Sequence, residues 1–313
     1  MTAAVSTRKA WLMAARPQTL PAAAAPVLVG TGLAVRAGVF APVPAAVALV
    51  GALLLQIGTN FANDYYDAVR GADTDDREGF TRVTAGGLIE PAEVKRAMYA
   101  TFALAIVVGT SLVYVGGVPI LIIGLASVVA GITYTGGPLP YGYRGLGDLF
   151  VFVFFGLVAV AGTYYVQAVG GVVGPFPLWI PEGTVPVAAI VAGLPAAGLS
   201  TAILVVNNIR DRRTDAATGK RTLAVVLGYR ASRIEWSALV GLAYAIPVVF
   251  WLDGYGTLVL LPLISAPLAI RLGATVWTRS DGAALNPALE RTGKLLFAHS
   301  ALFAAGLAAP TVL

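Results

Sequence analysis

Cysteine is absent from this sequence of 313 residues, and histidine occurs once, as His299. Without cysteine the chain can form no disulfide bond, thiolate metal site or cysteine nucleophile. The single histidine lies inside the last apolar segment, where we expect it to pack or to hydrogen-bond between helices.

Charged residues are also scarce. They make up 12% of the chain, well below the roughly 25% of an ordinary soluble domain, whereas hydrophobic residues make up 58%. The mean hydropathy is +0.80. These values indicate an integral membrane protein, and we expect the lipid bilayer, and no nucleic acid, among its partners.

Apolar stretches close to the roughly 20 residues that a helix needs to cross a bilayer recur along the whole chain. They fall at about residues 19–37, 42–63, 92–115, 118–135, 149–170, 185–210, 233–252, 256–277 and 293–312. The first follows basic residues, as a signal peptide would, but it is long enough to span and we expect it to be retained. We therefore predict one all-α domain over residues 1–313, a polytopic membrane protein with nine transmembrane helices.

The distribution of charge predicts the orientation of these helices. Nine spans place the N-terminus and the loops after the second, fourth, sixth and eighth spans on one side of the membrane. Of the 21 lysine and arginine residues, all except Arg36 and Arg271 fall in these segments, and Arg271 lies near the same end of its span. Only Glu182 and Asp253 among the acids fall opposite. By the positive-inside rule, the N-terminus and its side are cytoplasmic.

Two polar clusters end long apolar segments on this cytoplasmic side. The first comprises Asn60, Asn63, Asp64 and Asp67, whose spacings place them on one face of a helix. Carboxylates are costly near hydrocarbon and persist mainly where they face a polar cavity, pair with a base or hold a cation. The default interpretation of such a cluster is therefore a functional site.

The second cluster comprises Asn207, Asn208, Asp211 and Asp215 at the end of the sixth span, again at helical spacings. Two stripes of hard oxygen donors, without histidine or thiolate, suit Mg²⁺. This ion typically takes one or two carboxylates, with waters and substrate phosphates completing its shell. We therefore expect one shared pocket that holds a cation.

Basic residues follow both clusters. Arginine and lysine take the phosphate oxygens that Mg²⁺ leaves free, so interleaved acids and bases fit a metal diphosphate better than a bare cation. Lys220 and Arg221 are favoured for this site. The positive-inside signal is enough to explain Arg212, Arg213, Arg230 and Arg233.

The loop after the first cluster adds three acids, Asp73, Asp75 and Asp76. They either extend the metal site or are solvated acids paired with nearby arginines. A third polar segment, residues 134–148, joins the fourth and fifth spans, and its glycines and prolines predict a compact, bent loop. Its tyrosines and Arg144 either close a pocket or stack on an aromatic substrate, and the alternative for the tyrosines is a general anchor at the membrane interface.

Two motifs end the second and sixth spans, namely Asn63-Asp64-x-x-Asp67 and Asn208-x-x-Asp211-x-x-x-Asp215. Together with the nine spans, they resemble the UbiA superfamily of intramembrane aromatic prenyltransferases over nearly the whole chain. Other segments look like its 1,4-dihydroxy-2-naphthoate polyprenyltransferase branch, which makes demethylmenaquinone. They are Ala15-Arg16-Pro17-Gln-Thr-Leu-Pro21, Arg82-Val-Thr-Ala-Gly-Gly-Leu88, Tyr134-Thr-Gly-Gly-Pro138, Tyr143-x-Gly-Leu-Gly147-Asp148 and Gly219-Lys220-x-Thr222-Leu223.

The resemblance implies a central cavity whose cytoplasmic mouth binds Mg²⁺ and the diphosphate of a polyprenyl donor, with the tail in an apolar channel open to lipid. The prenyl group would pass to 1,4-dihydroxy-2-naphthoate with loss of CO₂ and diphosphate. The residues that the resemblance assigns to catalysis and metal binding are Asp64, Asp67, Asp211 and Asp215. Those that it assigns to the diphosphate are Asn60, Asn63, Arg77, Arg82, Tyr143, Asn207, Asn208 and Lys220.

Three alternatives remain. Within the superfamily the acceptor could be another aromatic compound, such as 4-hydroxybenzoate. A CDP-alcohol phosphotransferase would carry Asp-x-x-Asp-Gly, whereas Ala68 follows Asp67 here. A cation-coupled transporter would use intramembrane carboxylates as ion ligands, but these acids cluster at one face and not at mid-membrane.

Overall fold

The computed structural model describes residues 5–72, 79 and 82–310, and within these ranges the regular structure is helical, with no strand. The helices are α1 (Thr7–Ala15), α2 (Leu20–Arg36), α3 (Pro42–Val69), α4 (Pro91–Thr133), α5 (Gly147–Phe152), α6 (Ala159–Ala168), α7 (Val187–Val191), α8 (Leu194–Ala217), α9 (Leu223–Phe250), α10 (Ala266–Thr278) and α11 (Gly282–Ala308). Short segments of 3-10 helix lie at η1 (Pro17–Thr19), η2 (Tyr141–Arg144), η4 (Val169–Gly171) and η6 (Thr257–Ser265), and segments of π-helix lie at η3 (Val153–Val158) and η5 (Trp251–Tyr255).

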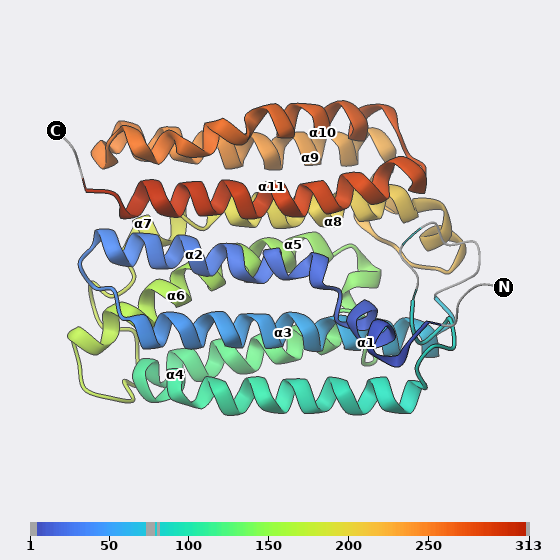
Figure 1. Ribbon diagram of the computed structural model, residues 1–313, viewed down its shortest axis with the longest axis horizontal. Coiled ribbons are helices and arrows are strands. Elements are labelled where there is room, and N and C mark those ends of the chain that lie inside the picture. The colour runs from blue at the N-terminus through green and yellow to red at the C-terminus, as the bar shows by residue number, and fades with distance from the viewer. Residues whose placement is uncertain (1–4, 73–78, 80–81, 311–313) are drawn as a thin grey trace.

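Seven helical stretches among the described residues are long and apolar enough to cross a membrane. The chain is therefore an integral membrane protein. The long helices lie side by side in one bundle, with the two ends of the chain at opposite ends of it (Figure 1). α11, which contains most of the last predicted span, is not among the seven.

α4 is a helical hairpin. At Gly117 the backbone leaves helical geometry, with φ 64°. Phe102 and Gly131 would lie about 44 Å apart in a straight helix, yet a Cβ on Gly131 would lie 3.2 Å from the Phe102 ring. The two arms therefore run antiparallel, and the predicted spans 92–115 and 118–135 correspond to one arm each.

The turn of the hairpin requires glycine. Only glycine adopts a positive φ without strain, and a Cβ on Gly117 would overlap the carbonyl oxygen of Pro177. The Val118 amide donates to that oxygen at 2.9 Å, so the long connection before α7 is fixed against the turn.

We expect Gly117→Ala to destabilise the protein by about 1–3 kcal/mol, because φ 64° with ψ −150° is a backbone conformation that essentially only glycine adopts. Thermal unfolding in detergent measures this as a lower Tm. The matched control is Gly124→Ala in the second arm, where an added Cβ meets no atom within 4 Å. Equal Tm values for the two variants would contradict the role given to Gly117.

α8 lies at the centre of the bundle and packs against α9, α11 and α5. Small residues allow these close approaches, as is usual between membrane helices. A Cβ on Gly198, for example, would lie 2.6 Å from the Leu239 carbonyl oxygen. α2 contacts α11, α6 and α3, and α3 runs along α4. The helices thus pack tightly around α8, and the space that remains open lies between α2, α3, α4, α5, α6 and α8.

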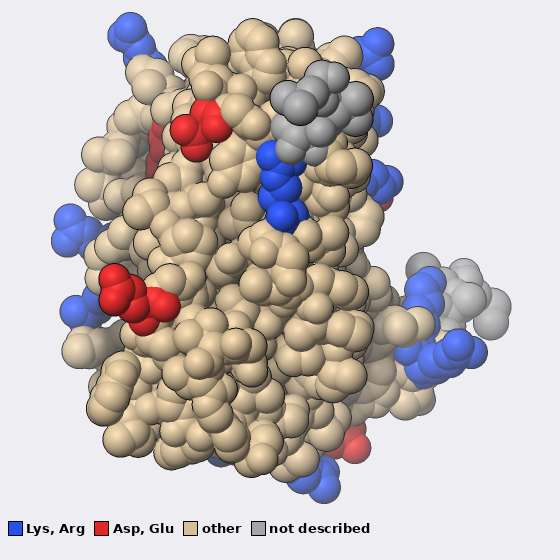
Figure 2. All heavy atoms as spheres, turned by 90° about the vertical axis from the view of Figure 1, so that its left-hand side faces the viewer, with Lys and Arg blue, Asp and Glu red and all other residues tan. Residues whose placement is uncertain are grey.

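α3 and α8 both end on the side where the N-terminus lies, and each carries a polar cluster in its last turns (Figure 1). The opposite end of the bundle presents mostly uncharged residues, with few charged side chains (Figure 2). The charge asymmetry expected from the sequence is therefore present between the two ends.

Candidate active site

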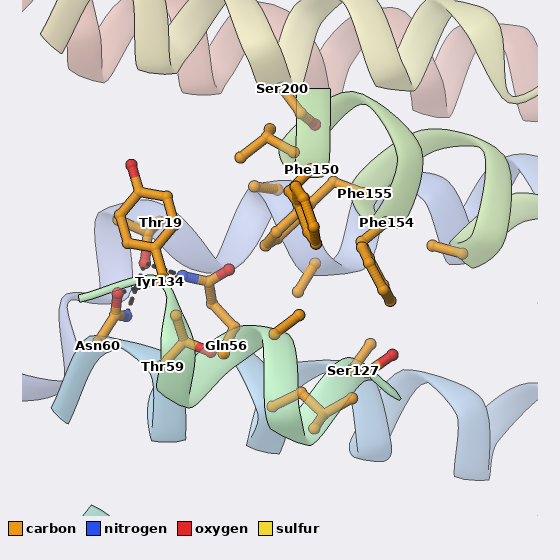
Figure 3. Close-up of a pocket in the computed structure, with 18 of the residues that line it drawn as sticks. Thr19, Gln56, Thr59, Asn60, Ser127, Tyr134, Phe150, Phe154, Phe155 and Ser200 are labelled. Carbon is orange, nitrogen blue, oxygen red and sulfur yellow. Dashed lines mark hydrogen bonds between the residues drawn. The ribbon is translucent and has the colours of Figure 1, made fainter. Parts of the chain in front are cut away.

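A cavity of about 570 Å³ lies between α2, α3, both arms of α4, α5, α6 and α8. At the end where α3 and α8 finish, polar side chains form its mouth, among them Asp67, Asp211 and Asp215. Further inside, the wall is largely apolar and aromatic (Figure 3). A ligand with a charged head and a long apolar tail fits a cavity of this kind.

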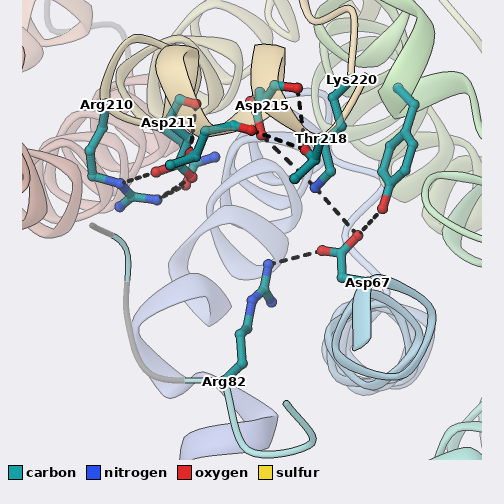
Figure 4. Close-up of polar contacts among 10 residues, drawn as sticks. Asp67, Arg82, Arg210, Asp211, Asp215, Thr218 and Lys220 are labelled. Atoms are coloured by element: carbon teal, nitrogen blue, oxygen red, sulfur yellow. Dashed lines mark hydrogen bonds and ion pairs between the residues drawn. The ribbon is translucent and has the colours of Figure 1, made fainter. Parts of the chain in front are cut away.

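The polar clusters of α3 and α8 form two sides of the mouth, called here the first and the second carboxylate wall. Asp67 is the centre of the first wall. It is 2% exposed. One carboxylate oxygen accepts a hydrogen bond from Arg82 Nη2 at 3.1 Å. The other accepts from the Tyr143 hydroxyl and lies 3.5 Å from Lys220 Nζ. Arg82 and Lys220 approach from two different loops (Figure 4), and Tyr143 comes from η2. The structure therefore brings together four residues that the resemblance assigned to one site.

Asp64 is placed differently from Asp67. Its Oδ2 accepts from the Thr84 backbone amide at 3.0 Å and from the Thr84 hydroxyl at 2.6 Å. Its Oδ1 lies 3.6 Å from Arg16 Nη2. Asp64 is 1% exposed and is not part of the cavity wall. Its assignment as a metal ligand stays a prediction, and Thr84 engages one of its two carboxylate oxygens.

The asparagines of the first cluster line the cavity below Asp67. Asn60 Nδ2 donates to the Ala15 carbonyl oxygen at 2.8 Å and to Thr19 Oγ1 at 2.9 Å. Asn63 Oδ1 accepts from the Thr135 hydroxyl at 3.0 Å. Asn60 therefore joins α3 to the α1–α2 junction, and its contact with a diphosphate stays a prediction.

In the second wall, Asp211 is held by its neighbour in the chain. Arg210 Nε and Nη2 each donate to one oxygen of the Asp211 carboxylate at 2.7 Å. The same guanidinium donates to Asn207 Oδ1 and to Asn286 Oδ1 on α11, both at 2.7 Å. This bidentate geometry is the strong form of such pairs, and it fixes the end of α8 against α11. Asn208, also predicted, is buried in the same wall.

Lys220 reaches the first wall because of how α8 ends. Gly219 adopts a positive φ of 79°, which reverses the chain as glycine commonly does after a helix. The Lys220 amide then donates to the Asp215 carbonyl oxygen at 2.9 Å. Its ammonium lies 4.0 Å from Asp215 Oδ1 and 4.5 Å from the centre of the Tyr143 ring. Lys220 thus bridges the two carboxylate walls.

The segment 134–148 closes one side of the mouth. The Arg221 amide donates to the Tyr143 carbonyl oxygen at 2.9 Å, whereas the Arg221 side chain is exposed. Arg221 therefore contributes its backbone to this closure, and not the side chain that the sequence favoured. Tyr141 stacks on Phe150, with ring centres 4.1 Å apart, and burial raises the pKa of Tyr141 well above its usual range. Its hydroxyl stays protonated and donates to the Ala130 carbonyl oxygen.

Several predicted residues cannot be placed. Arg77, Asp73, Asp75 and Asp76 lie outside the described residues. Other contacts were not anticipated from the sequence, namely those of Arg16 and Thr84 with Asp64 and that of Asn286 with Arg210. Arg16 and Thr84 lie within the segments that carry the family resemblance, so the sequence offered a signal for these two residues. Nothing in the sequence pointed to Asn286.

Opposite charges are closely balanced in this site. The four carboxylates are those of Asp64, Asp67, Asp211 and Asp215, and the cations beside them are Arg16, Arg82, Arg210 and Lys220. Among the described residues, no three acidic or histidine side chains converge as a ready-made metal site. The donors are nevertheless all hard oxygens on two facing walls. They fit an ion such as Mg²⁺ that draws its remaining ligands from water and a phosphate.

The comparison with known families agrees with this geometry. The UbiA prenyltransferase family matches residues 23–300. The chain belongs to this family. A UbiA relative from Escherichia coli (strain K12), named 1,4-dihydroxy-2-naphthoate octaprenyltransferase, is 40% identical over 97% of this chain and 96% of its own length. A protein of the same name from Mycobacterium tuberculosis (strain ATCC 25618 / H37Rv) is 37% identical over 95% of this chain and 96% of its own.

Solved UbiA structures share the fold. A UbiA homolog from Aeropyrum pernix K1 superposes with a TM-score of 0.67 at 15% identity, over 91% of this chain and 96% of its own. A UbiA homolog from Archaeoglobus fulgidus, bound to DMAPP and Mg²⁺, gives a TM-score of 0.58 at 16% identity, over 94% of this chain and 98% of its own. At these identities the likeness establishes the UbiA fold alone.

Proposed function

We propose that this UbiA protein transfers a polyprenyl group from polyprenyl diphosphate to 1,4-dihydroxy-2-naphthoate, giving demethylmenaquinol, CO₂ and diphosphate. The observation that carries the proposal is the pair of carboxylate walls at the mouth of an apolar cavity, joined by Lys220. The acceptor is supported by the relatives of that name, which match nearly the whole chain.

In this proposal Asp67, Asp211 and Asp215, with Asp64, would hold Mg²⁺. When bound, the metal would neutralise the departing diphosphate. Arg82, Lys220 and Tyr143 surround Asp67 and are placed to donate hydrogen bonds to phosphate oxygens, and such donors stabilise developing negative charge. Asn207 and Asn208 stand in the opposite wall and would offer further polar contacts.

The remaining steps of the proposed reaction take place in the apolar part of the cavity. The bond between the prenyl carbon and diphosphate oxygen breaks, which leaves allyl-cation character on that carbon. The apolar lining keeps water from it. The electron-rich ring attacks, a carbon–carbon bond forms, and the carboxylate on the attacked carbon leaves as CO₂, its bonding electrons restoring the aromatic ring.

We further propose one domain over residues 1–313 with nine spans, N-terminus and active site facing the cytoplasm. The two arms of α4 and the inclusion of α11 support the number nine. An odd number of passes also agrees with chain ends at opposite ends of the bundle (Figure 1). The orientation is supported by the positive-inside rule.

Purified protein in lipid nanodiscs tests the function. Incubation with polyprenyl diphosphate, 1,4-dihydroxy-2-naphthoate and Mg²⁺ is expected to give a prenylated naphthoquinol, identified by mass spectrometry. Chelation with EDTA is expected to abolish the product, and added Mg²⁺ to restore it. Product from 4-hydroxybenzoate but not from the naphthoate would show that the proposed acceptor is wrong. Turnover that resists EDTA would show that the proposed metal requirement is wrong. If no acceptor gives a product, the proposal that the protein is a prenyltransferase is wrong.

A further inference from the structure

Gln56 is a buried amide in the cavity that the reaction above does not use. It lies on α3, one turn from Asn60 and two turns from Asp64, and it is 8% exposed. Its Nε2 donates to Thr19 Oγ1 at 3.2 Å and to Asn60 Oδ1 at 3.1 Å. Its Oε1 is buried and has no hydrogen-bond partner in the described structure.

The orientation of this amide follows from a backbone carbonyl. The Ala15 carbonyl oxygen can only accept, so the nitrogen of Asn60 must face it, at 2.8 Å. Asn60 Oδ1 then faces Gln56 and requires a donor, which fixes Gln56 Nε2 on that side. The Thr19 hydroxyl donates to the Arg16 carbonyl oxygen at 2.9 Å and accepts from both amides. A flipped Gln56 would set two acceptors against each other.

Because the amide is planar, Gln56 Oε1 points away from Thr19 and Asn60. Figure 3 shows it directed into the space beneath Phe150 and Phe155. An unsatisfied buried acceptor costs about 1–3 kcal/mol. A fixed, buried acceptor of this kind is completed by a ligand that donates a hydrogen bond and is not completed by one that only accepts.

The surroundings of Gln56 favour an aromatic ligand. Tyr134 and Phe150 line the same cavity (Figure 3), and Phe150 stacks with Tyr141 at 4.1 Å and with Phe154 at 6.1 Å between ring centres. A cluster of aromatic rings suits an aromatic partner. Along α3, Gln56 is about 12 Å from Asp64, which leaves room for a diphosphate at the mouth with the reacting ring below it.

We propose that Gln56 is a specificity-determining residue that binds the aromatic acceptor by accepting a hydrogen bond from one of its ring hydroxyls. This inference rests on the proposed function. It adds the residue that recognises a hydroxyl of this acceptor. A quinone or an aryl ether at that position has no proton to donate and leaves Oε1 unpaired.

The test compares 1,4-dihydroxy-2-naphthoate with its 1-O-methyl and 4-O-methyl ethers. A site built around a hydroxyl rejects analogues that lack it by about 10⁴–10⁵-fold. We expect wild-type kcat/KM to fall by at least about 10²-fold for one of the two ethers. In Gln56→Met, we expect the KM for the naphthoate to rise about 10–100-fold and the discrimination to fall below about tenfold. The KM for polyprenyl diphosphate is expected to change less than twofold.

The control is Thr201→Val on α8. Its buried hydroxyl is satisfied by the Ala197 carbonyl oxygen at 2.8 Å and lies outside the cavity wall. We expect it to keep wild-type discrimination. If Gln56→Met raises both KM values and keeps the preference for the hydroxyl, the residue is structural and the inference is wrong. Whether or not the variant folds, equal use of both ethers by the wild type overturns the inference.

These outcomes are separate from those of the proposed function. Failure to prenylate the naphthoate at all would remove the proposed function. Normal prenylation without any preference for a free hydroxyl would remove only the role of Gln56. If the wild type uses another phenol instead, the same comparison is made with that phenol and its methyl ether.

Discussion

Turnover is expected to fall by about 10²–10³-fold in Asp67→Asn, the range seen when one preorganised electrostatic contact to a transition state is removed. The asparagine keeps the size of the side chain but removes the charge that Arg82 and Lys220 surround at 3.1 and 3.5 Å. The Asp67 carboxylate is the proposed partner of the metal diphosphate and of the two cations that position it, and all of them would lose its charge. Product formation at saturating Mg²⁺ measures the effect.

The control for Asp67→Asn is Asp253→Asn, because Asp253 is an exposed acid in η5, away from the cavity. We expect near-normal turnover for this control. Asp67→Asn with a wild-type Tm and near-normal activity would exclude Asp67 from the site. A large loss of activity in Asp253→Asn would instead contradict the placement of the site at the other end of the bundle.

Arg210→Met is expected to destabilise the protein strongly. Removing one partner of a buried ion pair costs about 3–5 kcal/mol, because the other charge stays buried without compensation. Here that charge is Asp211, and Asn286 and Asn207 lose their donor as well. A Tm lower by about 5–15 °C is expected.

The double variant Arg210→Met, Asp211→Asn separates stability from function. With both charges removed, much of the lost Tm is expected to return, since a buried pair often contributes little net stability. Activity is not expected to return, because Asp211 would be absent from the metal site. A single variant as stable as the wild type would show that this pair does not fix α8 against α11.

Much of the arrangement of the candidate site was predictable because its acidic residues are close together in the sequence. Helical spacing alone places Asp64 and Asp67, and likewise Asp211 and Asp215, on single faces, and both clusters do lie at the same end of the bundle. The family resemblance added Arg82, Tyr143 and Lys220, and the structure brings all three to Asp67.

What was not predictable depends on contacts between distant segments. Spacing made Asp64 and Asp67 equivalent, but only the fold of the following loop places Thr84 over Asp64 and leaves Asp67 at the cavity. Asn60 has the right position for a ligand, yet its amide is engaged by the α1–α2 junction. The turn at Gly117 was correctly placed between two spans, although its contact with Pro177 depends on a remote connection.

The most direct test of the account is the binding of Mn²⁺, a paramagnetic substitute for Mg²⁺, with and without inorganic pyrophosphate. The four cations already neutralise the four carboxylates, so we expect weak binding of Mn²⁺ alone. With pyrophosphate, affinity is expected to rise about 5–150-fold, the usual range of coupling between two ligands. Asp67→Asn and Asp211→Asn should each lose this gain. An Mn²⁺ affinity that pyrophosphate leaves unchanged, or a gain that survives in both variants, would contradict a metal diphosphate held between the two walls.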